Sequence, residues 1–217
     1  MRQVSDVKES YEIGSKSNID QPNQELPEDV LPDFRSFLMY FHWECHHTAE
    51  TILSAMALGI GLSDENHFRP TNPGHNNQLR LLHYPPVPVA DVEQHLSTEM
   101  GAHSDRGSII MLFQDDCGGL QIEDPHNPGV FINVPPPKDE VVMNVGDLMI
   151  RWVNDALKST VHRVTLPPKQ DRFTGDEHMT RARYSVPHFV SPEGQSVVEC
   201  LPSCADEKPP AKYKPIE

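Results

Sequence analysis

The stretch Met100-Gly101-Ala102-His103-Ser104-Asp105 places an imidazole and a carboxylate two residues apart. In an extended backbone, residues i and i+2 point to the same face, so His103 and Asp105 are candidate ligands for one metal ion. The triplet His42-Trp43-Glu44 repeats this pattern, but it falls in a segment with helical spacing, where such residues lie nearly opposite each other. Because the chain has 12 histidines, the first pair alone is weak support for a site.

A further histidine occurs downstream in Lys158-Ser159-Thr160-Val161-His162-Arg163-Val164, a β-branched segment typical of a strand. We expect this strand to bring His162 to the His103 and Asp105 pair. Two histidines and one carboxylate on one side of an ion form a facial triad, which suits Fe(II) and leaves the opposite coordination positions open.

A possible anion clamp lies in Arg181-Ala182-Arg183-Tyr184-Ser185-Val186-Pro187. In a strand, Arg183 and Ser185 share one face while Tyr184 turns away. The guanidinium offers a planar fork to a carboxylate, and the hydroxyl two residues later can donate to the same group. Considered alone, this segment would ordinarily be interpreted as an exposed cross-strand arginine.

The composition restricts the class of protein. The 217 residues suit one domain with a proper core, while 21 prolines and a mean hydropathy of −0.52 indicate many turns. A net charge of −14 without a Lys/Arg stripe argues against nucleic acid and anionic membranes as partners. The sequence has no apolar run of membrane-spanning length and no signal-peptide core, so we expect a cytoplasmic protein. The four cysteines lack zinc-site spacing and are expected to be reduced.

Three regions are expected along the chain. Residues 1–26 are polar and lack periodicity, which predicts an irregular lead-in. Residues 27–62 contain apolar side chains at helical spacing and end near Gly59 and Gly61, which predicts a supporting amphipathic helix of about seven turns. His42 and His46 share one face of this helix, and we interpret them as packing residues. Residues 63–217 form the third region.

This third region predicts short strands separated by Gly, Pro and Asp turns, with no helical pattern between them. The expected strands are Leu79–Tyr84, Ser108–Phe113, Leu120–Ile122, Val130–Val134, Val141–Val145, Leu148–Val153, Thr160–Thr165, Arg183–Val190 and Ser196–Cys200. Such a series is typical of an antiparallel barrel or jelly roll. The fold class is therefore mainly β with supporting helices.

The order of these motifs resembles a known family. His103-x-Asp105, Asn144-Val145-Gly146-Asp147, Lys158-Ser159-x-x-His162-Arg163-Val164 and Arg183-Tyr184-Ser185 are similar to the Fe(II)- and 2-oxoglutarate-dependent dioxygenases of the isopenicillin N synthase-like type. So is Leu79-Arg80-Leu81-Leu82-His83-Tyr84-Pro85-Pro86. The resemblance covers roughly residues 1 to 200.

The resemblance implies a double-stranded β-helix with Fe(II) held by His103, Asp105 and His162. It also implies that Arg183, Ser185 and Tyr84 bind the cosubstrate 2-oxoglutarate, with ascorbate as a possible reductant. The expected reaction is oxidation, most often hydroxylation, of a C–H bond of a small molecule by O2, with release of succinate and CO2. Relatives have longer N- and C-terminal regions, so the resemblance implies an N-terminally shortened fold with a more open pocket.

Two alternatives stay open on the sequence. An iron oxidase that needs no 2-oxoglutarate would use Arg183 and Ser185 to bind a carboxylate of its own substrate. A noncatalytic, truncated relative would bind metal or a partner protein without turnover. Release of succinate separates these hypotheses. The sequence does not specify the substrate or the oligomeric state.

Overall fold

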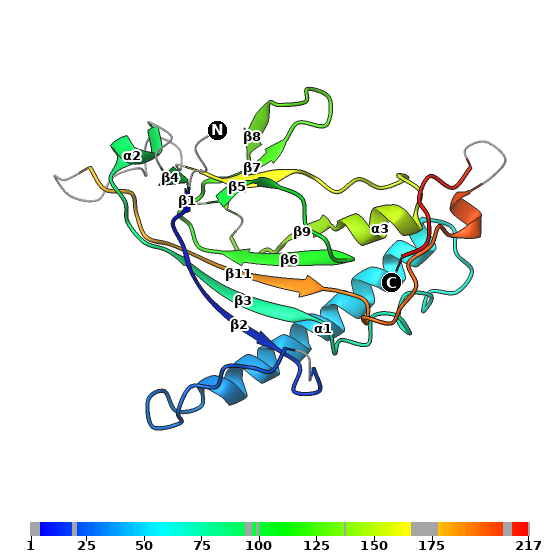
Figure 1. Ribbon diagram of the computed structural model, residues 1–217, viewed down its shortest axis with the longest axis horizontal. Helices are drawn as coiled ribbons and strands as arrows, with labels where there is room; N and C mark the ends of the chain where they lie inside the picture. Colours follow the sequence, from blue (N-terminus) through cyan, green and yellow to red (C-terminus); the bar gives the residue numbers. More distant parts are fainter. Residues whose placement is uncertain are drawn as a thin grey trace.

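Two β-sheets and one long helix form the framework of the protein (Figure 1). This computed structural model describes residues 5–18, 21–93, 97–98, 100–136, 138–165, 178–205 and 210–216. The larger sheet is antiparallel and contains, in spatial order, β2 (Glu9–Gly14), β3 (Gln78–Tyr84), β11 (Arg183–Val190), β6 (Ile109–Gln114) and β9 (Val142–Val145). The smaller sheet contains β5 (Met100–His103), β10 (His162–Val164), β7 (Leu120–Glu123) and β8 (Phe131–Asn133).

The two sheets face each other across a cavity lined by strands of both. Alternate residues of a strand point to opposite faces, so the larger sheet turns one set of side chains toward the cavity and the other toward the helical layer. A short parallel pair, β1 (Ser5–Asp6) and β4 (Ser97–Thr98), lies apart from both sheets. This arrangement is the predicted jelly roll, and the prediction of a mainly β fold is confirmed.

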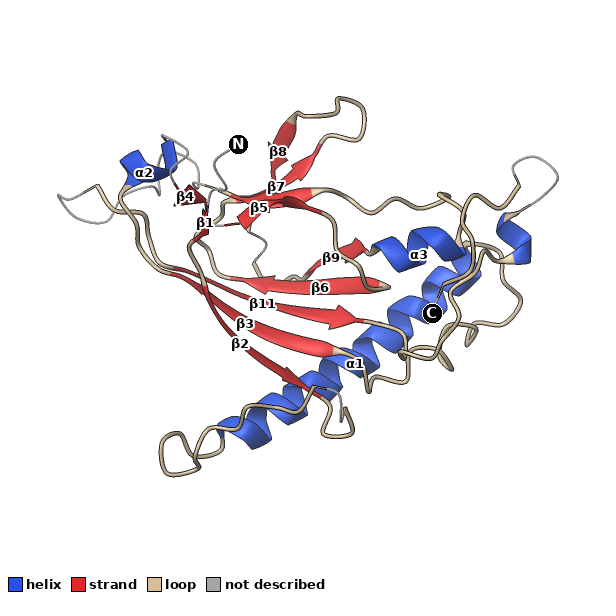
Figure 2. Cartoon of the chain, in the orientation of Figure 1, coloured by secondary structure: helices blue, strands red, loops and turns tan. Residues whose placement is uncertain are grey.

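The long helix α1 (Phe34–Gly59) runs across the outer face of the larger sheet, as Figure 2 shows. Its buried residues recur at helical spacing, as expected for a helix with one apolar face. Cys45, Ala49, Leu53 and Ala57 pack in one core cluster with Ile109 and Val190 of the sheet. The predicted supporting helix is confirmed, and its packing holds the sheet that carries half of the cavity wall.

Three of the expected elements are wrong. The lead-in is not irregular throughout, because Glu9–Gly14 forms edge strand β2, whose Ile13 packs with Leu38 and Leu79. Leu148–Val153 is not a strand: residues Asp147–Trp152 form helix α3, which buries Met149 and Trp152 on one face. Short apolar runs fit both periods, so only packing separates them. Ser196–Cys200 contributes a single bridge, from Val198 to Ile216.

The described residues contain two further short helices, α2 (Val89–Glu93) and the 3-10 turn Pro202–Cys204. The sequence did not predict α2, because five residues give too short a window for a helical period. All four cysteines are free thiols, as expected. Within the described ranges, no helix has both the length and the apolar character needed to cross a bilayer.

Candidate metal centre and cosubstrate pocket

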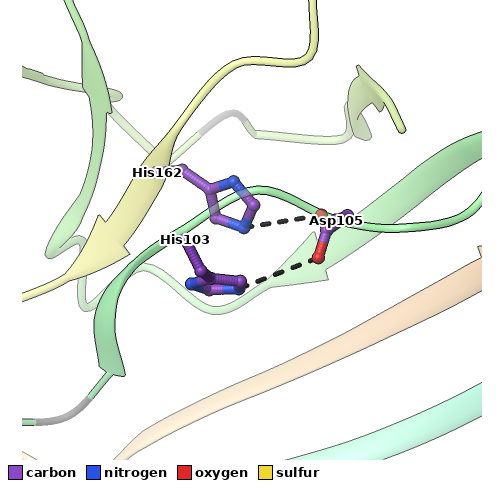
Figure 3. A group of neighbouring side chains, drawn as sticks. All are labelled: His103, Asp105 and His162. Carbon is purple, nitrogen blue, oxygen red and sulfur yellow. Dashed lines mark ion pairs between the residues drawn. The ribbon is translucent and has the colours of Figure 1, made fainter. Parts of the chain in front are cut away.

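Two segments that are far apart in the chain bring three side chains together, His103 and Asp105 from one and His162 from the other (Figure 3). All three line the cavity. His103 is the last residue of β5, and His162, the first residue of β10, lies directly opposite it in antiparallel register. Asp105 follows two residues after the end of β5. One potential ligand atom from each residue lies within 4.8 Å of the others. Among the described residues, this is the single group of three or more that fits a metal ion.

The backbone fixes which nitrogen of each histidine is available. Nδ1 of His103 donates to the Gly101 carbonyl at 2.8 Å, and Nδ1 of His162 donates to the Thr160 carbonyl at 3.1 Å. Because a carbonyl only accepts, each Nδ1 carries a proton, and in a neutral ring Nε2 then keeps its lone pair. Such backbone acceptors are the usual outer partners of metal-binding histidines.

The free nitrogens face the carboxylate of Asp105. Nε2 of His103 lies 3.7 Å from Oδ1, and Nε2 of His162 lies 3.5 Å from Oδ2 (Figure 3). These distances are too long for good hydrogen bonds. With its Nδ1 proton directed to a backbone carbonyl, a neutral ring directs its Nε2 lone pair to the space between the three groups, where a cation fits. Two imidazole nitrogens and one carboxylate oxygen are also the donor set of the 2-His-1-carboxylate Fe(II) sites, so the residues fit this metal.

Asp105 is held by its neighbours on β9 and α3. The Asn144 side chain donates to Asp105 Oδ2 at 3.1 Å, and the Asp147 amide donates to the Asp105 carbonyl at 2.7 Å. The two segments touch closely, because a Cβ atom on Gly146 would lie 2.0 Å from the Gly107 carbonyl oxygen. Asp105 itself is buried. The sequence motif around Asn144 matched the family, but its contact with Asp105 was not predicted.

Arg183 lies in the same cavity with its guanidinium almost completely buried. Nε donates to the Gly118 carbonyl at 3.0 Å, Nη1 to Ser185 Oγ at 3.1 Å and Nη2 to Gln114 Oε1 at 3.0 Å. Its central carbon lies 5.0 Å from the ring centroid of Tyr84, which is also buried. No carboxylate among the described residues pairs with this charge. A buried cation without an anionic partner is costly, so the site favours an anionic ligand.

The predicted alternation along β11 is confirmed. Arg183 and Ser185 are 1% and 3% exposed on the cavity face, whereas Tyr184 is 55% exposed on the other. The cavity has a volume of about 440 Å³. It is lined by all six candidate residues, namely His103, Asp105, His162, Arg183, Ser185 and Tyr84. The sequence did not predict that Gln114 and Gly118 contact Arg183. Gln114 ends β6 and Gly118 follows that strand, and the sequence around them gives no local signal of a contact with β11.

His42 and His46 lie on α1, outside this cavity, in agreement with their interpretation as packing residues. His42 is fully buried against His188 of β11, with ring centroids 5.2 Å apart. Burial lowers the pKa of His42 to about 4 and the pKa of His188 to about 3, and the neighbouring histidines contribute to both shifts. Both rings are therefore neutral at ordinary pH.

Comparisons with known proteins agree with this geometry. The family model described as the 2OG-Fe(II) oxygenase superfamily matches residues 75–192, which contain all six candidate residues. The chain belongs to this superfamily. The predicted resemblance is thereby confirmed at the level of the family.

Several curated relatives of this chain come from fungi. The chain is 38% identical over 204 residues to the 2-oxoglutarate-dependent dioxygenase htyE of Aspergillus rugulosus. This match covers 93% of the chain and 60% of that relative. The chain is 36% identical to the proline hydroxylase buaE of Petromyces alliaceus, with 97% and 64% covered. The chain therefore spans about three fifths of the length of these relatives.

The chain is also similar to solved structures. A full-length protein of Neurospora crassa, solved in complex with alpha-KG, is 38% identical, has a TM-score of 0.89, and is matched over 100% of this chain and 64% of that one. The same Neurospora crassa protein has been solved with alpha-KG and thymine, at 39% identity and a TM-score of 0.88, with 99% and 62% covered. An oxygenase-family protein from Caulobacter crescentus has 28% identity and a TM-score of 0.82, with 100% and 68% covered.

Proposed function

We propose that this protein is an Fe(II)- and 2-oxoglutarate-dependent oxygenase that oxidises, most often by hydroxylation, a C–H bond of a small molecule. One observation carries the proposal. The candidate metal ligands His103, Asp105 and His162 lie in the same cavity as Arg183. The guanidinium of Arg183 is buried and has no carboxylate partner among the described residues. Three metal ligands alone would fit many chemistries. The buried guanidinium adds a binding place for the carboxylate of an organic acid.

In this proposal His103, Asp105 and His162 hold Fe(II) through Nε2, a carboxylate oxygen and Nε2. When bound with 2-oxoglutarate and O2, the iron supplies the oxidising chemistry, which oxidises the substrate and releases succinate and CO2. The three residues occupy one face of the ion. Asn144 keeps the Asp105 carboxylate oriented, and the carbonyls of Gly101 and Thr160 hold the proton of each neutral ring on Nδ1, which leaves the Nε2 lone pair for the metal.

Arg183 and Ser185 would receive the distal carboxylate of 2-oxoglutarate, with Tyr84 beside them. Gly118 and Gln114 hold the guanidinium in place before the ligand arrives, so little side-chain freedom is lost on binding. The cavity that holds Arg183 and the metal ligands is also lined by apolar residues such as Leu82, Leu112 and Val164. Apolar walls exclude water and strengthen the interaction between the carboxylate and the guanidinium.

The test is consumption of 2-oxoglutarate and release of succinate by the purified chain with Fe(II) and O2. We expect both, even without the substrate, at a slow rate that stops when O2 is removed. Arg183→Leu should lose 2-oxoglutarate binding but keep Mn(II) binding, measured by calorimetry as a probe of the metal group. Metal binding and substrate oxidation without succinate would instead support an iron oxidase. Metal binding without any turnover would support a noncatalytic relative.

The remaining features are expectations that accompany this proposal. The small-molecule substrate is not carried over from relatives, because one is named a proline hydroxylase while another was solved with thymine. Ascorbate as a reductant and a cytoplasmic location stay predictions. The division into a lead-in at 1–26, a helical support at 27–62 and a jelly-roll core at 63–217 is likewise proposed as the functional organisation, with Glu9–Gly14 of the lead-in adding edge strand β2 to the larger sheet of the core.

A further inference from the structure

The β6–β7 turn, residues 114–119, encloses the buried guanidinium of Arg183. Among the described residues, two acceptors of this guanidinium belong to the turn: Gln114 Oε1 and the Gly118 carbonyl, each at 3.0 Å. The proposed function assigns Arg183 to 2-oxoglutarate but leaves open what keeps these two acceptors in place. We infer that Asp115 is a positioning residue, which holds the turn closed around Arg183 so that the guanidinium stays oriented for the organic acid. This inference rests on the proposed function.

The carboxylate of Asp115 joins the turn to β11. Its Oδ2 accepts a hydrogen bond from the Tyr184 amide at 2.6 Å, and its Oδ1 accepts one from the Cys117 amide at 3.0 Å. The Asp115 amide also donates to the Tyr184 carbonyl at 3.1 Å. Hydrogen bonds to an ionised carboxylate are stronger than those between neutral groups. One side chain therefore ties the residue after Arg183 to the residue before Gly118.

Asp115 continues the connection where the pairing of β6 with β11 ends. Ser185 lies opposite Gln114, the last residue of β6, so Tyr184 lies one position beyond the described pairing. At that position the Tyr184 amide donates to the Asp115 side chain instead of to a strand carbonyl. This amide belongs to the peptide bond that follows Arg183, so the carboxylate fixes the backbone that carries the guanidinium.

The turn depends on such a tie because it contains two glycines in succession. Gly118 and Gly119 have φ values of 79° and 86°, in the left-handed region that glycine adopts readily. Glycine also has the most backbone freedom, so the position of the Gly118 carbonyl depends on the bonds that flank it. The bond from the Cys117 amide to Asp115, two residues earlier, is of the Asx-turn type and fixes the chain just before this pair.

Asp115 is connected to Arg183 and not to the candidate metal ligands. Arg183 lines the cavity, whereas Asp115 does not. Among the described residues, the partners of the Asp115 carboxylate are the amides of Cys117 and Tyr184, and neither belongs to the strands that carry the two ligand histidines. A guanidinium that is oriented in advance loses little freedom when a carboxylate binds. Loss of the Asp115 bonds should therefore weaken binding of the organic acid and leave metal binding unchanged.

The test compares Asp115→Ala with Asp116→Ala in the full chain. Asp116 is the matched control, because it is the neighbouring carboxylate, is 85% exposed and pairs with Arg181 at 2.9 Å. Calorimetry measures the Mn(II) affinity and then the 2-oxoglutarate affinity of the Mn(II)-loaded protein. We expect Asp115→Ala to weaken 2-oxoglutarate about tenfold, as for the loss of one charge-assisted hydrogen bond, while the Mn(II) affinity changes less than twofold. Asp116→Ala should change both affinities less than twofold.

Asp115→Asn is a second variant that keeps one acceptor oxygen but turns an amide nitrogen toward a backbone donor. Its loss of 2-oxoglutarate affinity should lie between those of the wild type and Asp115→Ala. In assays of succinate release, the KM for 2-oxoglutarate should rise about tenfold in Asp115→Ala, while kcat stays within twofold. Thermal unfolding of each variant checks that the fold is kept.

The inference is overturned if Asp115→Ala binds 2-oxoglutarate as tightly as the wild type does. It is also overturned if this variant loses Mn(II) and 2-oxoglutarate affinity to the same extent, because Asp115 would then support the fold as a whole. If the wild-type chain binds Mn(II) but not 2-oxoglutarate, the proposed function itself fails, and the role of Asp115 fails with it.

Discussion

At the scale of single residues, the candidate metal site depends on three ligands that have no substitute among the described residues lining the cavity. His103→Ala and Asp105→Ala each remove one of three donors, so we expect Mn(II) affinity to fall by more than about 100-fold, beyond the loss typical of outer-shell changes. Succinate release should stop. The matched control is His126→Ala, which removes an exposed histidine and should leave both quantities unchanged. Full metal affinity in both ligand variants would refute the assignment.

Asn144 acts on the metal through Asp105 and is a positioning residue. Asn144→Ala removes the hydrogen bond to Asp105 Oδ2, so the carboxylate can rotate away from the two imidazoles. We expect Mn(II) affinity to fall by about 10- to 100-fold, with the melting temperature little changed. Asn133→Ala, on an exposed part of β8, is the control. An unchanged affinity would show that the backbone alone orients Asp105.

At the scale of elements, the turn from β9 into α3 is joined to the segment after β5 by close backbone contact. Gly146→Ala places a Cβ atom 2.0 Å from the Gly107 carbonyl oxygen, so one segment has to shift. We expect a loss of about 1–3 kcal/mol of unfolding free energy and weaker Mn(II) binding, because Asp105 lies on the displaced segment. Urea unfolding measures the first effect and calorimetry the second.

Gly194→Ala is the control for this turn, since nothing lies within 4 Å of an added Cβ there. It should change neither stability nor metal affinity. If Gly146→Ala lowered stability but left metal binding intact, the turn would be a folding element without influence on the site.

At the scale of the whole molecule, the contact between α1 and the larger sheet is sensitive to pH. His42 and His188 are buried there with pKa values of about 4 and 3, below the ordinary 6.5. Between pH 6.5 and these lower pKa values, the unfolded chain therefore binds more protons than the folded chain. The free energy of unfolding falls as the pH drops below 6.5. Each histidine contributes a slope of up to about 1.4 kcal/mol per pH unit, and above pH 6.5 the contribution is constant.

Urea unfolding at several pH values between 7.5 and 5 measures this slope. His188→Leu should make it shallower, because the apolar side chain has no proton to gain on unfolding. His126→Gln, at an exposed position, should leave the slope as in the wild-type protein. Equal slopes in all three proteins would show that these rings do not govern acid stability.

Much of this protein follows from local sequence. The alternation in Arg183-Tyr184-Ser185 predicts which side chains share a face, because residues of a strand point alternately up and down. The apolar spacing of residues 34–59 predicts α1, because one face of a helix must be buried. The spacing of His103 and Asp105 marks a candidate ligand pair. Each of these inferences needs only residues close together in the chain.

The tertiary structure alone decided the rest. It fixed the register that sets His162, whose approach the sequence predicted, directly opposite His103. It gave Asp105 its partner Asn144 and Arg183 its partner Gln114. It also made Glu9–Gly14 a strand by pairing it with β3, and it made residues 147–152 a helix by packing Met149 and Trp152 inward. These outcomes rest on contacts between segments far apart in the chain. Their free energy comes from burial and pairing that no single stretch of sequence contains.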